Sequence, residues 1–226
     1  MTQVVPAIIP DTKEQLEEEI KKVSKFASLV QIDISDGIFT PTKTWPYNGR
    51  DREFFDKLKT QEVGWPKWEE IDIEIHLMVK SPEDVVLDWI HTGASSIVAH
   101  IEATSNFQKV IDICREHNVL VGIAMKPSTD ISRIESFVSH VDFIQVMGSD
   151  LIGKHGVELD PKAISQIKVL QKLYPERTIA IDIGVTEKTE GILISAGADK
   201  IVSGGAILKA DNPQEVFHNL ESFNDK

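Results

Sequence analysis

The chain alternates eight short β-rich runs with stretches of helical periodicity, and this order constrains its fold more than any other feature. A helix after each strand returns the chain to the start of the next strand, so the pattern is typical of parallel sheets. The expected strands are residues 4–9, 29–34, 71–78, 96–101, 120–125, 143–147, 178–183 and 200–203. The expected helices are residues 12–26, 82–91, 107–117, 131–138, 161–173 and 186–196.

Eight strand–helix units within 226 residues predict a single (β/α)8 barrel domain, a TIM barrel, that spans residues 1–226. The competing architecture is a doubly wound open sheet. That fold normally carries a glycine-rich fingerprint after its first strand, where this chain reads PDTKEQ. The strand count therefore favours the barrel.

Composition excludes several classes of partner. The formal net charge of −12 disfavours nucleic acid binding. No apolar stretch approaches the ~20 residues of a membrane span, and the first residues do not resemble a targeting signal, so a cytoplasmic protein is expected. The single cysteine, Cys114, lies in a helical segment and is interpreted as a small buried hydrophobe rather than a catalytic thiol.

Ionisable residues stand at the ends of three expected strands: Asp33, His76 and Asp182. In a (β/α)8 barrel the carboxyl ends of the strands surround the active site. Carboxylates at strand ends also cap loops or pair with lysines, which is the alternative interpretation. Burying three such groups together is costly unless they are paired or bind a metal, so a functional site is favoured.

Five segments in this order resemble the ribulose-phosphate 3-epimerase family. They are QIDISDG (31–37), IEIHLMV (73–79), VAHIEAT (98–104), IAIDIGV (179–185) and IVSGGAI (201–207). The resemblance implies a (β/α)8 barrel of the ribulose-phosphate-binding type. It also implies interconversion of ribulose 5-phosphate and xylulose 5-phosphate with a divalent metal ion and two aspartates.

Carried onto this chain, the resemblance makes Asp33 and Asp182 the catalytic acid and base, and also metal ligands. It makes His76 a further ligand. Gln31 stands where the family has a metal-binding histidine, so it is the fourth candidate ligand. The ion is Zn, Fe, Mn or Mg; an oxygen-rich set suits Mn or Mg somewhat better than a histidine-rich zinc site does.

The remaining candidates are residues that would contact a phosphosugar substrate. Backbone amides in glycine-rich turns suit a phosphate, and the loop IGKHG is expected to form a lid, where His155 is a further but weaker candidate. Ala7 replaces a substrate-contacting serine of the family, and Ile183 replaces a glycine. The candidates are Ala7, Met78, Met147, Gly153, Gly156, Gly184, Gly204 and Gly205.

An apparent insertion within residues 38–70 contains Trp45, Trp65 and Trp68. These side chains are expected either to be exposed, serving an interface in a homo-oligomer, or to form part of a buried lid. The sequence does not decide between the two.

Two other functions are compatible with such a barrel. One is a phosphate-binding decarboxylase or Schiff-base aldolase, for which only Lys126 comes close to a suitable catalytic lysine. The other is a non-catalytic phosphosugar-binding protein that has lost full metal binding, a hypothesis based on Gln31 and the altered loop. The presence of both aspartates argues against the second, because simple binding needs no opposed proton-transfer groups.

Overall fold

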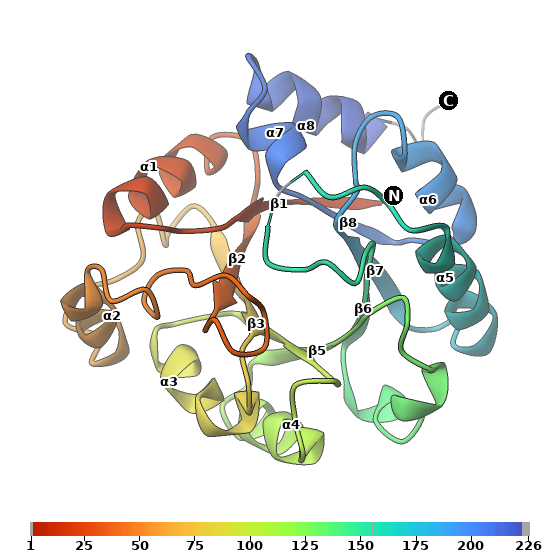
Figure 1. Cartoon of the computed structure of the whole chain (residues 1–226). Coiled ribbons are helices and arrows are strands. Elements are labelled where there is room, and N and C mark those ends of the chain that lie inside the picture. Colours follow the sequence, from red (N-terminus) through yellow and green to blue (C-terminus); the bar gives the residue numbers. More distant parts are fainter. Residues whose placement is uncertain (1, 155, 223–226) are drawn as a thin grey trace.

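The computed structural model describes residues 2–154 and 156–222 and contains a closed barrel of parallel strands in sequential order, β1 to β8 (Figure 1). The last strand pairs with the first, so the predicted (β/α)8 barrel is confirmed. The strands are β1 Gln3–Ile8, β2 Leu29–Ser35, β3 Asp72–Met78, β4 Ser96–His100, β5 Leu120–Met125, β6 Phe143–Met147, β7 Thr178–Asp182 and β8 Lys200–Ser203.

Helices surround the barrel on its outside (Figure 1). They are α1 Lys13–Val23, α2 Arg52–Lys59, α3 Val86–His91, α4 Phe107–Glu116, α5 Pro161–Leu173, α6 Glu190–Ala196, α7 Gly205–Leu208 and α8 Pro213–Glu221. Short 3-10 turns add η1 Pro82–Asp84, η2 Ile131–Arg133 and η3 Val138–His140.

The predicted helix over residues 131–138 is wrong. The segment forms η2 and η3 instead, because its amides bond three residues back: Ile134 donates to Ile131, and Phe137 donates to Ile134. The Asp130 side chain accepts the amide of Ser132 and supports this tight turn. Three-residue turns are therefore the only helical structure described between β5 and β6.

The segment 38–70 contains α2, which lies between β2 and β3 in the ring of helices and which the sequence analysis did not predict. Trp45 and Trp65 are buried, and the Trp45 ring contacts Phe55 of α2 with ring centroids 5.9 Å apart. The expectation of exposed side chains is wrong for these two tryptophans, because Trp45 packs against α2 and Trp65 packs against Trp45. Trp68 is exposed.

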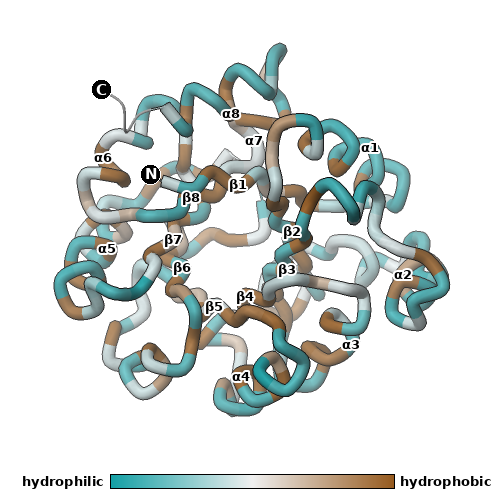
Figure 2. The backbone as a smooth tube through the Cα atoms, turned by 180° about the vertical axis from the view of Figure 1, so that it is seen from behind, coloured by the Kyte–Doolittle hydropathy of each residue, from teal (hydrophilic) through white to brown (hydrophobic). Residues whose placement is uncertain are grey.

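The apolar core lies mainly between the outer face of the barrel and the helices. Figure 2 shows hydrophobic strand segments within a ring whose outer surface is largely hydrophilic. Cys114 belongs to this core, and burial raises the pKa of its thiol to about 12, as expected for an inert cysteine. No helix among the described residues is long and apolar enough to cross a membrane.

A buried ion pair occupies the amino-terminal end of the barrel interior. The Glu74 carboxylate accepts hydrogen bonds from the Lys200 ammonium at 2.6 and 2.7 Å and from the Ser96 hydroxyl at 2.7 Å. The Lys200 ammonium also lies 4.3 Å from the centre of the Phe143 ring. These contacts occupy the barrel interior below the carboxyl ends of the strands, on the opposite side from the predicted ligands.

Candidate active site

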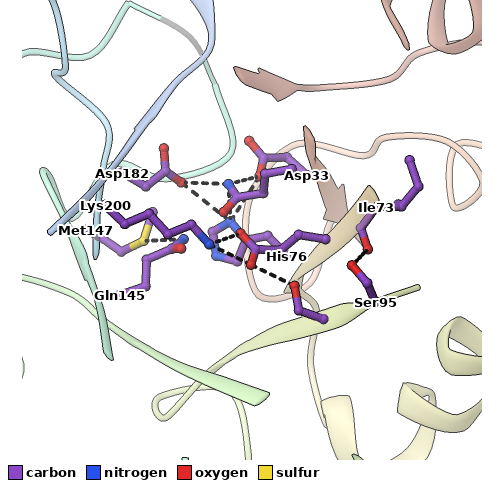
Figure 3. A network of polar contacts seen from close by, with 11 residues as sticks. Asp33, Ile73, His76, Ser95, Gln145, Met147, Asp182 and Lys200 are labelled. Carbon is purple, nitrogen blue, oxygen red and sulfur yellow. Dashed lines mark hydrogen bonds and ion pairs between the residues drawn. The ribbon is translucent and has the colours of Figure 1, made fainter. Parts of the chain in front are cut away.

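Strand register brings the three predicted ligands together. Asp33 lies opposite His76 across the β2–β3 pairing, and Asp182 ends β7. Their ligand atoms all lie within 4.8 Å of one another, and all three side chains are buried (Figure 3). The structure therefore groups two carboxylates and one imidazole at the carboxyl end of the barrel, as the strand-end pattern predicted.

Gln31 lies beneath this group on β2 and is fully buried. Its amide nitrogen donates to Asp33 at 2.9 Å and to Asp182 at 3.3 Å, and it lies 3.4 Å from Nδ1 of His76. Its Oε1 has no hydrogen-bond partner among the described residues. In this structure Gln31 thus links the two carboxylates as a donor, whereas the sequence suggested only an oxygen ligand.

This donor set fits a divalent cation. Two carboxylates and one imidazole nitrogen supply ligand atoms to one point, and the orphaned amide oxygen of Gln31 supplies a fourth if the amide rotates by 180°. An amide of this kind has nearly the same shape in both orientations. The four residues can therefore hold a cation without movement of the backbone.

Burial and close charges perturb the acidity of the site. Burial, assisted by the neighbouring charge of Asp33, raises the pKa of the Asp182 carboxyl. Burial opposes the charged form of His76, but the hydrogen bond and charge of Asp33 outweigh it and raise the pKa of that imidazole. A proton held near neutral pH is what a group needs to act as both acid and base.

The raised pKa of Asp182 predicts how stability depends on pH without a metal ion. An acid whose pKa is higher in the folded state than its usual value near 3.8 favours folding while protonated, and this contribution is lost as pH rises through the folded pKa. In the presence of a chelator, Asp182→Asn should gain stability relative to wild type between pH 4 and pH 8. The gain should exceed ~1 kcal/mol, since one pKa unit corresponds to about 1.4 kcal/mol.

Urea denaturation at both pH values measures this difference, and Asp150→Asn, at an exposed carboxylate, is the control. A stability difference between Asp182→Asn and wild type that is the same at pH 4 and pH 8 would contradict the assignment.

A pocket of about 260 Å³ opens directly above Asp33 and Asp182. All eight predicted substrate contacts line it: Ala7, Met78, Met147, Gly153, Gly156, Gly184, Gly204 and Gly205. Two cationic residues that the sequence analysis missed, Lys154 and Lys209, line it as well. Lysine is common on surfaces, so no sequence signal distinguished these two from the other lysines.

Two loops meet over this pocket. The loop between β6 and α5 lies over the barrel centre in the view of Figure 1, and the Gly153 carbonyl accepts a hydrogen bond from the Thr42 hydroxyl at 2.9 Å. Thr42 belongs to the loop that follows β2. The predicted lid segment therefore borders the pocket, while His155 lies outside the described residues.

The backbone that carries Asp182 is closely packed. Ile183 adopts φ of +79°, a strained conformation for a β-branched residue. The Gly148 amide donates to the Asp182 carbonyl at 2.6 Å, and a Cβ on Gly148 would come within 2.0 Å of the Ile183 carbonyl oxygen. Only glycine permits this approach, which the sequence analysis did not detect.

Comparison with known proteins agrees with this geometry. The model of the ribulose-phosphate 3-epimerase family matches residues 3–208. The chain belongs to this family. It is 31% identical to ribulose-phosphate 3-epimerase of Schizosaccharomyces pombe over 97% of this chain and 92% of that protein. It is 26% identical to the Bacillus subtilis ribulose-phosphate 3-epimerase over 97% and 98% of the two chains. The expected family and its enzyme class, the isomerases, are thereby confirmed.

Solved structures of other enzymes share the fold. A 3-hexulose-6-phosphate synthase from Salmonella typhimurium superimposes with a TM-score of 0.72 at 16% identity, covering 98% of this chain and 97% of that one. An orotidine 5'-monophosphate decarboxylase from Sulfolobus solfataricus gives 0.63 at 12% identity, covering 100% and 99%. At these identities the likeness supports the barrel alone. In the present protein, the ammonium of Lys126, the lysine considered for a Schiff-base aldolase, lies 4.6 Å from the centre of the Phe39 ring.

Proposed function

We propose that this protein is a metal-dependent epimerase that inverts C3 of a ketose phosphate, converting ribulose 5-phosphate to xylulose 5-phosphate. One observation carries the proposal: two buried carboxylates, Asp33 on β2 and Asp182 on β7, converge on one small pocket. Inverting a carbon next to a carbonyl requires proton removal on one face and proton return on the other. Two carboxylates on different strands suit that task.

Asp33 and Asp182 exchange the roles of acid and base between the forward and the reverse reaction. The group that accepts the C3 proton of one epimer donates a proton to form that same epimer, and the other carboxylate serves the opposite face. Without a cation, burial and the charge of Asp33 raise the pKa of Asp182, and a bound cation would oppose this shift. Met78 and Met147 offer apolar surface beside the carboxylates, which limits access of water to the reacting carbon.

A divalent cation held by Asp33, His76 and Asp182, with Gln31 as a fourth ligand, would stabilise the negative oxygens of an enediolate. Oxygen donors predominate in this set, which suits Mn or Mg, while the imidazole keeps Zn or Fe compatible with it. Asp33 and Asp182 are both candidate metal ligands and proton-transfer groups, so loss of the cation should alter the acidity of both carboxylates.

The phosphate of the substrate is proposed to bind at the far side of the pocket. Gly184, Gly204 and Gly205 present backbone there, and Lys209 adds positive charge. This local charge opposes the net charge of −12, which disfavours an anionic ligand at long range. Lys154 on the lid loop gives a second cation beside the same space.

The direct test is conversion of ribulose 5-phosphate to xylulose 5-phosphate by purified protein, with metal-stripped protein compared against Mn, Zn, Fe and Mg added in turn. The proposal expects turnover that depends on one of these ions. Binding of the sugar phosphate without turnover under any ion would instead favour the non-catalytic phosphosugar-binding protein.

Gln31→His is expected to tighten divalent metal binding by at least about tenfold. The imidazole is a stronger ligand than a neutral amide, and this position already lies within 3.4 Å of His76 Nδ1 and both carboxylates. Competition against a fluorescent chelator measures the affinity. Gln145→His is the matched control, because Gln145 is equally buried in the barrel and its amide nitrogen contacts the Met147 sulfur instead. Unchanged affinity in Gln31→His would place residue 31 outside the coordination sphere.

A further inference from the structure

A chain of buried hydrogen bonds leads from the candidate metal site to the loop after β4. His76 Nδ1 lies 3.0 Å from Asp33 Oδ1, and His76 Nε2 lies 3.0 Å from Nε2 of His100. On its other side, His100 Nδ1 lies 3.1 Å from Glu102 Oε2. Both histidines are fully buried, so within the described residues their ring nitrogens have only these partners, the Gln31 amide and, at 3.5 Å from His76 Nδ1, Asp182.

Glu102 forms the outer end of this chain. Its other oxygen, Oε1, accepts the Lys126 amide at 2.8 Å and the Thr129 hydroxyl. An ionised carboxylate only accepts, so Nδ1 of His100 carries a hydrogen and donates it to Glu102. A His100 ring with its one hydrogen on Nδ1 has a lone pair on Nε2.

The side of His76 that faces the carboxylates decides where its hydrogen lies. Nδ1 is the nitrogen that points to Asp33 and Asp182, so a cation held there leaves the hydrogen of the ring on Nε2. Two imidazole nitrogens at 3.0 Å require one donor and one acceptor, so His100 Nε2 is then the acceptor. The two ring planes differ by 22°, so this hydrogen can lie near the plane of the lone pair it meets. Without the cation, the 3.0 Å contact between His76 Nδ1 and Asp33 holds a shared proton, which metal binding would release.

We propose that Glu102 and His100 are positioning residues that keep the proton of His76 on Nε2 and so present Nδ1 as a metal ligand. This inference rests on the proposed metal-dependent function and deepens it. Without an acceptor at Nε2, His76 would place its hydrogen on Nδ1 and donate it to Asp33. That hydrogen would occupy the position that the cation needs. The chain thus selects the tautomer that the site requires.

His100→Phe removes the acceptor while keeping a buried ring, and His100→Asn restores an acceptor in a smaller side chain. The nitrogen-15 shifts of the imidazoles, recorded on metal-stripped protein, report which nitrogen is protonated. In wild type we expect hydrogens on His76 Nε2 and His100 Nδ1 and a bare His100 Nε2. In His100→Phe we expect the His76 proton on Nδ1 and Mn²⁺ affinity reduced 10- to 100-fold. His100→Asn should recover part of that loss.

Glu83→Gln is the matched control, because this buried carboxylate holds Thr104 and Ser105 of the same loop without contacting His100. It should leave the His76 proton and Mn²⁺ affinity unchanged. A bare His76 Nε2 in wild type, or wild-type Mn²⁺ affinity in His100→Phe, would overturn the proposal. Both readouts work without substrate, so an absence of epimerase activity does not affect them. A wild-type protein that binds no divalent ion would overturn the metal site and this inference together.

Discussion

Replacing Asp33 or Asp182 by asparagine is expected to reduce the epimerisation rate by at least about a thousandfold while leaving the fold intact. General acid–base groups contribute about 10² to 10⁴ each, and here each group also supplies a ligand to the same site. Asparagine has nearly the same shape as aspartate but cannot exchange a proton. Turnover measured at saturating metal, with circular dichroism to monitor folding, tests this expectation.

The two variants should also differ in the epimer whose C3 proton they can still remove. If each carboxylate serves one face of C3, each variant keeps the ability to remove the C3 proton from one epimer only. Incubation in D2O should then exchange the C3 proton of xylulose 5-phosphate in one variant and of ribulose 5-phosphate in the other. Asp150→Asn, whose carboxylate accepts from Ser128 outside the pocket lining, should behave as wild type. Full turnover in either active-site variant would exclude the two-base mechanism.

Lys200→Met is expected to destabilise the protein by about 3–5 kcal/mol, the cost of leaving one member of a buried ion pair uncompensated. Glu74 is 1% exposed and, among residues 2–154 and 156–222, would keep only the Ser96 hydroxyl as a charge-stabilising side-chain donor. Methionine retains most of the volume beside the Phe143 ring, so little of the effect should come from a cavity. Urea denaturation gives the change in the free energy of unfolding.

The double variant Lys200→Met/Glu74→Leu separates charge from packing. Apolar replacement of a whole buried ion pair is often nearly neutral, so the double variant should recover most of the lost stability. Lys59→Met removes a lysine from a more exposed ion pair with Asp88 and should cost about 1 kcal/mol or less. A loss below about 1 kcal/mol in Lys200→Met would contradict a large electrostatic contribution of this buried ion pair to stability.

Fold and strand positions were predictable because each strand is a short apolar run and five of the outer helices, α1, α3, α4, α5 and α6, carry clear helical periodicity. The helix α2 was not predicted, because the segment that contains it is rich in tryptophans, prolines and charged residues and was interpreted as an insertion. The helix expected over 131–138 failed because a short apolar pattern does not distinguish an α-helix from successive 3-10 turns.

In the site, Asp33, His76 and Asp182 were predictable because parallel strands bring their carboxyl ends together. The donor role of Gln31 was not, since an amide can present either an oxygen or a nitrogen and only its neighbours select one. The close approach of Gly148 to Ile183 depends on how the chains after β6 and β7 meet. Contacts of that kind are set by tertiary packing and leave no local signal.

Deuterium incorporation at C3 of ribulose 5-phosphate in D2O tests the central claim most directly. Proton NMR follows the reaction with metal-stripped protein and then with Mn, Zn, Fe and Mg restored in turn. We expect exchange only with a divalent ion present, accompanied by the appearance of xylulose 5-phosphate. Absence of exchange with every ion would contradict the assignment of Asp33 and Asp182 as proton-transfer groups for this substrate.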